Sequence, residues 1–321
     1  MLLSPGTYRG PGNRDIEWWG KSLVVKSSNG PQQTIIDCEQ LGRGFYVHNA
    51  YRDESSGSIE GLTIRNGWAT HESPDLGRGG GIFCASSIAI MDCRIEHCWA
   101  NSDGGGLYLI VFDGIVDRCF FFDNYAGRGG GIYFEVGHGL ITNCTIVENV
   151  AFTGGGICFG GAWENRLFGS TVVGNAANGG GGGGIRAFNP LLLERCIVWD
   201  NCTIAHGDEI YGHGDFLGCD IDRSGVYTGA GNTYDENCID ADPMFCLDIP
   251  CGAHVEGDWM LDMNSPCLPE HSPGGTLIGA LGLGCGGAPS TGACCLASGS
   301  CVVESQQACV QESGIYMGDA V

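Results

Sequence analysis

The chain has 321 residues, of which 57 are glycine and 19 are cysteine, and its formal net charge at pH 7 is −22. This excess of acid, with Lys21 and Lys26 as the two lysines, argues against binding to nucleic acid or to anionic membrane surfaces. No stretch is long and apolar enough to cross a bilayer, so the sequence predicts no membrane span in this chain.

Residues 1–58 are predicted to form the entry coils of a repeat array, with a long loop near residues 51–57. Residues 59–203 carry the regular part of that array. In it, the triplet Gly-Gly-Gly followed by an aliphatic residue occurs at residues 79–82, 104–107, 129–132, 154–157 and 182–185. The first four copies are 25 residues apart and the fifth follows after 28, which predicts a repeat architecture.

Each repeat holds two short runs in which apolar residues alternate with others, the pattern of a β-strand. About 25 residues with short strands and tight corners are typical of one coil of a parallel β-solenoid. The alternation places Ile82 and Cys84 inside the coil and Phe83 outside. Coils that stack at about 4.8 Å bring equivalent side chains into ladders.

Two interior ladders are expected. The first consists of asparagines that bond the backbone of the turns, at Asn124, Asn149, Asn175 and Asn201. The second consists of small buried thiols, at Cys93, Cys119, Cys144 and Cys196.

An outward column of aromatic residues comprises Phe83, Tyr108 and Tyr133. Exposed on a flat sheet, such a stripe would bind sugar rings. The alternative is an aromatic ladder that stabilises the sheet or packs beneath a loop.

A second column, just before the glycines, comprises Arg78, Asp103 and Arg128. An arginine there could form a bidentate hydrogen bond with the carboxylate of a uronate sugar. The alternative is a stack of surface ion pairs. Together the two columns form the candidate ligand-binding strip.

Residues 204–285 are less regular and are predicted to finish and cap the array. Residues 208–262 contain 13 acidic residues and one base, Arg223. Carboxylates of this density can hold Ca²⁺, and Asp240 and Asp242, which bracket a turn, are the candidate ligands. The alternative is a solvated acidic surface, and no other cofactor is indicated.

The later cysteines lie in loop-rich sequence and are expected to form disulfides; they are Cys238, Cys246, Cys251, Cys267 and Cys285. Residues 286–292 have the composition of a linker. Residues 293–321 are predicted to be an incomplete cysteine-rich module, and its cysteines are Cys294, Cys295, Cys301 and Cys309. Disulfides are expected in this module and zinc is the alternative.

These motifs resemble those of right-handed parallel β-helix proteins of the pectate-lyase-like superfamily. The repeats are similar to the Gly-Gly-aliphatic and Phe-x-x-Asn repeats of polymorphic outer-membrane proteins, and the resemblance covers residues 1–285. It implies an all-β right-handed solenoid and an extracellular or cell-surface protein. We therefore expect a fragment that lacks its export signal.

Two functions follow as hypotheses. The first is a structural or adhesive role with polysaccharide or cell-surface glycan as partner; the second is a polysaccharide lyase or glycoside hydrolase acting on acidic glycans. Inverting hydrolysis needs two carboxyl groups roughly 6.5–9.5 Å apart, a spacing that Asp123 and Glu148 on adjacent coils could meet. Exposed structural acids are the alternative, and the sequence identifies no catalytic residues.

Overall fold

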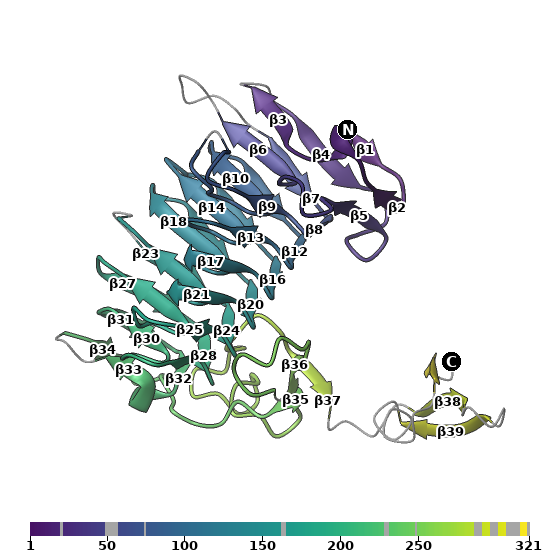
Figure 1. Ribbon diagram of the computed structural model, residues 1–321. Helices are drawn as coiled ribbons and strands as arrows, with labels where there is room; N and C mark the ends of the chain where they lie inside the picture. The colour runs from purple at the N-terminus through teal and green to yellow at the C-terminus, as the bar shows by residue number, and fades with distance from the viewer. Residues whose placement is uncertain are drawn as a thin grey trace.

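The computed structural model describes residues 1–19, 22–48, 57–73, 75–161, 165–227, 231–247, 249–285, 291–295, 301–305 and 315–319. They form a right-handed parallel β-solenoid of about ten turns, with about 26 residues in each turn (Figure 1). No α-helix forms among these residues, and the two 3-10 turns are η1 (Pro11–Asn13) and η2 (Arg223–Gly225). The predicted fold is therefore confirmed.

Four parallel sheets, which we name A to D, make up the wall of the solenoid. Sheet A contains β1 (Leu2–Leu3), β4 (Val24–Ser27), β7 (Ser58–Glu60), β11 (Ala89–Met91), β15 (Ile115–Asp117), β19 (Leu140–Thr142), β23 (Asn165–Phe168), β27 (Leu191–Glu194), β31 (Gly214–Leu217) and β34 (Thr233–Tyr234). Sheet B contains β2 (Gly6–Tyr8), β5 (Thr34–Asp37), β8 (Thr63–Arg65), β12 (Arg94–Glu96), β16 (Phe120–Phe122), β20 (Thr145–Val147), β24 (Thr171–Val173), β28 (Ile197–Trp199) and β32 (Asp220–Ile221).

Sheets C and D complete each coil. Sheet C contains β3 (Ile16–Trp19), β6 (Phe45–His48), β10 (Ile82–Ala85), β14 (Leu107–Ile110), β18 (Ile132–Val136), β22 (Ile157–Phe159), β26 (Ile185–Ala187), β30 (Ile210–Tyr211) and β33 (Val226–Tyr227). Sheet D contains β9 (Trp68–Ala69), β13 (Trp99–Ala100), β17 (Tyr125–Arg128), β21 (Val150–Thr153), β25 (Ala176–Ala177) and β29 (Cys202–Thr203). The chain passes through A, B, D and C in that order, so the coils continue beyond residue 203 as far as β34.

The glycine triplets form the corner between sheets D and C. The first glycine of a triplet, such as Gly104 with φ 67°, adopts a backbone conformation that L side chains rarely reach. At the second position, a Cβ on Gly105 would lie 2.4 Å from the Gly130 carbonyl oxygen of the next coil. Only glycine fits there, and the triplet fixes where each strand of sheet C begins.

The core follows the predicted alternation. Ile82, Cys84 and Ile95 point inward and are completely buried, and they belong to one apolar column that runs from Val25 to Val226. Phe83 points outward from the same strand and belongs to a separate cluster. The face assignment of the first strand of each repeat is therefore confirmed.

Residues 240–285, apart from residue 248, which the structure does not describe, form what we call the return segment. It contains a small sheet of β35 (Phe245–Leu247), β36 (Asp258–Asp262) and β37 (Leu283–Cys285), and it lies alongside the solenoid (Figure 1). Trp259 packs against Phe122, Val147 and Val173 on the outer face of sheet B. This apolar outer face explains why the return segment docks there.

A last antiparallel sheet consists of β38 (Thr291–Cys295), β39 (Cys301–Ser305) and β40 (Ile315–Asp319). The side chains of these strands, most of the expected linker and Cys309 lie outside the described residues. The disulfide module expected there, with its zinc alternative, stays a prediction.

Candidate functional site

The predicted aromatic column exists on the outer face of sheet C, but it is not an exposed platform. Phe83, Tyr108 and Tyr133 occupy successive rungs, and the ring centroids are 5.2 and 5.5 Å apart in stacked pairs. Their exposed fractions are 7%, 0% and 3%, so the expectation of an exposed stripe is wrong. The faces of these rings stack against the neighbouring rings. This is the sheet-stabilising aromatic ladder that we gave as the alternative.

The predicted charged column explains part of this burial. Arg128 donates two hydrogen bonds to Asp103, at 2.7 and 2.9 Å, and Arg78 Nε lies 3.6 Å from the same carboxylate. The two guanidinium groups lie over Tyr133 and Tyr108, at 4.7 and 5.2 Å from the ring centroids. Asp103 is 2% exposed, so the carboxylate that these arginines bind is supplied by the protein itself.

Sheet D carries an exposed aromatic ladder on its outer face. Trp68, Trp99 and Tyr125 are paired in register on adjacent strands and are 41%, 51% and 40% exposed. The Trp99 and Tyr125 ring centroids lie 4.7 Å apart, and the Trp68 indole N–H donates to Asn101 Oδ1 at 3.3 Å. We call these three residues the sheet D ladder.

Sequence reasoning missed the sheet D ladder although its signal was present. Each of the three aromatic residues directly precedes an alanine: Ala69, Ala100 and Ala126. These alanines point inward and form a fully buried cluster of their own. The alternation of aromatic and alanine across three repeats marks a third short strand with an outward aromatic position.

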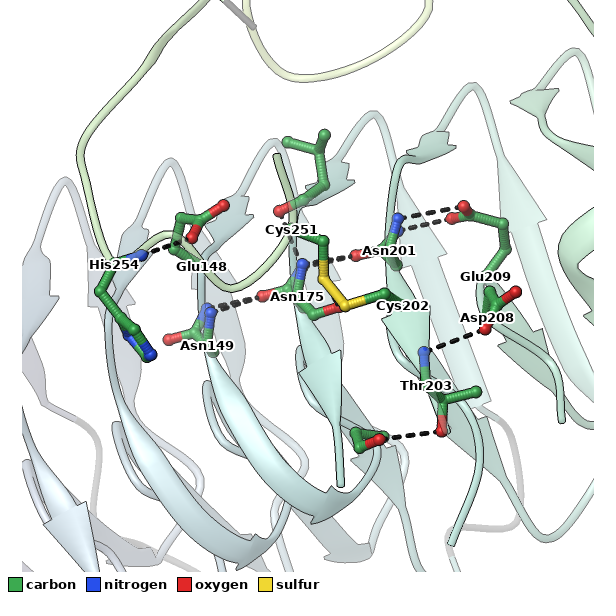
Figure 2. The surroundings of a disulfide bond; sticks show 12 residues. Glu148, Asn149, Asn175, Asn201, Cys202, Thr203, Asp208, Glu209, Cys251 and His254 are labelled. Atoms are coloured by element: carbon green, nitrogen blue, oxygen red, sulfur yellow. Dashed lines mark hydrogen bonds between the residues drawn. A yellow bond between two sulfur atoms is a disulfide. The ribbon is translucent and has the colours of Figure 1, made fainter. Parts of the chain in front are cut away.

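The asparagine ladder is confirmed and is closed by a glutamate (Figure 2). Asn149 N–H donates to Asn175 Oδ1 at 3.0 Å, and Asn175 N–H donates to Asn201 Oδ1 at 2.9 Å. Asn201 in turn donates to both carboxyl oxygens of Glu209, at 3.0 and 2.6 Å. Burial raises the pKa of Glu209 well above its ordinary value, although these hydrogen bonds act in the opposite direction.

The cysteine ladder is confirmed as free and buried. The Cys93 and Cys144 thiols donate to backbone carbonyls within their own coils, at 3.2 and 3.1 Å. Burial raises the pKa of the Cys93 and Cys119 thiols, which keeps them protonated and unreactive.

Of the five later cysteines expected to pair, three do so. Cys246 bonds to Cys285 within the return segment, and Cys251 bonds to Cys202 of sheet D. The prediction is wrong for Cys238 and Cys267, which are free. Cys238 extends the interior thiol ladder, where its sulfur accepts the Cys219 N–H, and Cys267 donates to Asp220 at 3.0 Å.

The return segment is also fixed by charged groups where it crosses the corner between sheets B and D. His254 N–H donates to Glu148 Oε2 at 2.9 Å (Figure 2), and the His254 and His97 rings bond the two oxygens of Asp123, at 2.6 and 2.8 Å. Arg94 and Glu256 form a bidentate ion pair at 2.9 and 2.7 Å. These contacts and the Cys202–Cys251 disulfide attach residues 251–256 to the wall of the solenoid.

Comparison with protein families agrees with this geometry. The family model described as "Right handed beta helix region" matches residues 13–175, about half of the chain.

The chain belongs to the right-handed β-helix family.

This β-helix family includes surface proteins and polysaccharide-acting enzymes. Comparison with curated proteins and with solved structures gave no match. The similarity to repeats of polymorphic outer-membrane proteins stays a prediction. Membership therefore establishes the fold, and function has to be argued from the surface of this β-helix.

Asp123 and Glu148, the pair considered for inverting hydrolysis, occupy the same corner of adjacent coils of the β-helix. Glu148 is completely buried, so the expectation of an exposed acid is wrong for this residue. Burial raises its pKa to about 7. Burial also opposes ionisation of Asp123, but the hydrogen bonds from His97 and His254 prevail and lower its pKa. A general acid must reach the glycosidic oxygen, and Glu148 lies beneath the return segment.

The calcium prediction concerns the turn that follows the last coil of the β-helix. Asp240 and Asp242 are both exposed, and Asp242 Oδ1 accepts the Met244 N–H at 2.8 Å. Among the described residues, no group of three or more His, Cys, Asp or Glu side chains is arranged to hold a metal ion. Calcium at this turn stays a prediction.

Proposed function

We propose that this β-helix is an extracellular, non-catalytic protein that binds polysaccharide through the sheet D ladder. The observation that carries the proposal is the solvent exposure of Trp68, Trp99 and Tyr125 in one register. Flat aromatic rings on a rigid sheet offer apolar faces to the C–H faces of sugar rings, and they lose little side-chain entropy on binding.

The spacing of the ladder suits an extended polymer. Adjacent strands of a sheet lie about 4.8 Å apart, so a chain that runs along the solenoid axis meets one aromatic side chain at each coil. The parallel pairing of β9, β13 and β17 holds the three side chains on one line. An extracellular location agrees with the two disulfides. Among the described residues, no helix is long and apolar enough to cross a membrane.

A glycan array with the wild-type chain and the variants Trp99→Ala and Tyr125→Ala tests the proposal. We expect each variant to lose about tenfold in affinity for the glycans that the wild type binds. Tyr227→Ala is the matched control, because Tyr227 is 39% exposed on the outer face of sheet C, away from the ladder.

Binding that is unchanged in both ladder variants would show that the ladder is not the site. Reducing-end and unsaturated-uronate assays on the same glycans decide between binding and catalysis. Turnover of any polysaccharide by the purified wild-type chain would favour the lyase or hydrolase hypothesis.

A further inference from the structure

A pocket of about 460 Å³ adjoins the Trp68 end of the sheet D ladder. Its wall includes Asp15, Glu17, Arg43, Trp68, Thr70 and Ser73. Trp68 belongs to the first strand of sheet D and therefore contributes both to the ladder and to this pocket. We call this hollow the Trp68 pocket.

Arg43 lines the Trp68 pocket, and its guanidinium lies over the Tyr46 ring, 5.0 Å from the ring centroid. Its side chain is 2% exposed, and its Nη1 pairs with Asp75 at 3.0 Å. Its Nε and Nη2 atoms are buried and have no hydrogen-bond partner. An unpaired buried donor on a charged group is costly, so a ligand oxygen that accepts from it gains affinity.

The acidic residues of the pocket provide the complementary acceptors. Asp15 and Glu17 are both exposed, and one oxygen of each already accepts a hydrogen bond, from Arg43 N–H at 3.1 Å and from His48 Nε2 at 3.2 Å. The Glu17 side chain is 46% exposed, which leaves room for a ligand hydroxyl group to donate to it. The pocket therefore places hydroxyl acceptors, hydroxyl donors and an indole around one small volume.

The charge balance of the pocket selects among sugars. Two carboxylates, Asp15 and Glu17, and one guanidinium, that of Arg43, are found among the described residues that line the pocket. Arg43 is already paired with Asp75, so the two lining carboxylates are in excess. A uronate would be repelled by this excess of negative charge, which agrees with the net charge of −22 for the whole chain. The same carboxylates would attract a cationic amino sugar, but its ammonium group has no lone pair to accept from the unpaired N–H groups of Arg43, whereas a hydroxyl oxygen has.

We propose that the Trp68 pocket binds one end of an uncharged glycan chain, with a pyranose in the pocket and the following rings over Trp99 and Tyr125. This inference rests on the proposed function and names the chemical class of its ligand. The hydroxyl groups donate to Asp15 and Glu17 and accept from Arg43, and Trp68 contacts an apolar face of the sugar.

Calorimetric titration of the full chain tests this proposal. The probes are uncharged hexasaccharides of β-1,4-glucose, β-1,3-glucose and β-1,4-mannose, together with hexagalacturonate and a chitosan hexasaccharide. We expect at least one uncharged probe to bind more tightly than either charged probe. For that probe, Trp68→Ala and Glu17→Gln should each weaken binding by roughly tenfold.

Glu194→Gln is the matched control, because the Glu194 side chain is 45% exposed on another sheet. It should bind like the wild type, and thermal unfolding of every variant confirms that it is folded. Loss of binding in Trp99→Ala with unchanged binding in Trp68→Ala and Glu17→Gln overturns the pocket and leaves the proposed function standing. Tighter binding of either charged probe overturns the uncharged class. Absence of binding by all five probes overturns both proposals.

Discussion

The carboxyl group of Glu209 takes the position that an asparagine of a following coil would occupy beside Asn201. Both the backbone N–H and the side-chain Nδ2 of Asn201 donate to it, as each earlier asparagine donates to the next. Glu209 stands where earlier coils have the third glycine of the triplet. In those coils a side chain at the third glycine position would crowd the asparagine that follows it in the chain. A Cβ on Gly156, for example, would lie 3.0 Å from Asn175.

Removal of this terminal acceptor should destabilise the solenoid. Glu209→Ala leaves the buried backbone N–H of Asn201 without an acceptor and removes one of the three acceptors of its Nδ2 group. We expect a loss of about 2 kcal/mol in the free energy of unfolding. Glu209→Gln keeps an acceptor oxygen and should lose less than half as much. Chemical denaturation measures both, with the exposed Glu236→Ala as control. Equal losses in the alanine and glutamine variants would contradict this role.

Glu148 should make the stability of the protein depend on pH. Its pKa is about 7 in the folded chain against an ordinary value of 4.5, so it ionises at lower pH in the unfolded chain than in the folded one. Its favourable contribution is therefore complete below about pH 4.5 and is lost as the pH rises through 7. We expect wild-type stability to fall by on the order of 2 kcal/mol more than that of Glu148→Gln between pH 5 and 8.

Burial also raises the pKa of Glu209 and of Asp220, so these groups make stability fall with pH as Glu148 does. The wild type therefore has to be compared with Glu148→Gln to isolate the contribution of Glu148. Denaturation curves at several pH values give the difference directly. Parallel pH profiles for the wild type and Glu148→Gln would show that this carboxyl group does not contribute.

Tyr108→Phe should stabilise the protein. The Tyr108 hydroxyl is buried and has no hydrogen-bond partner, so its removal relieves a desolvation cost while the ring keeps its stacked neighbours. We expect a gain of about 1 kcal/mol in the free energy of unfolding. Tyr108→Ala removes the ring and should cost about 3 kcal/mol. A destabilised Tyr108→Phe would reveal a bond that this hydroxyl makes.

The Cys202–Cys251 disulfide should control how firmly the return segment is attached. It closes a separation of 49 residues, and a cross-link of that length stabilises by about 4 kcal/mol in the chain-entropy model. In Cys251→Ser, hydrogen exchange should accelerate in residues 249–258 and remain slow in β16 and β20. Cys285→Ser, which breaks the other disulfide, should leave residues 251–256 protected.

The period, the corner glycines and the interior ladders could be predicted from sequence because each coil repeats the same local constraints. Gly105 and Asn149 are required by contacts with neighbouring coils, so they recur at the same interval as the coils. The outer surface does not follow that rule. Whether Tyr108 or Trp99 is exposed depends on groups such as Arg78 that reach over a ring, and the repeat does not encode them.

The return segment could not be placed from its own sequence either, since it has no repeat. The surface on which the return segment docks could nevertheless be recognised in the sequence of the solenoid. Phe122, Val147 and Val173 occupy outward positions of sheet B and are apolar in three successive coils. An outward apolar column predicts a covering element, although not which part of the chain supplies it.

The return segment also changes how the solenoid can unfold. In a stack of coils each repeat contacts only its neighbours, so coils can fray from one end independently of the rest. Here Glu256 binds Arg94, Cys251 is bonded to Cys202 and Cys267 contacts Asp220, so one short stretch joins coils that share no sheet hydrogen bond. We therefore expect the coils between Arg94 and Asp220 to unfold as a single cooperative block, and fraying to be confined to coils outside these two residues.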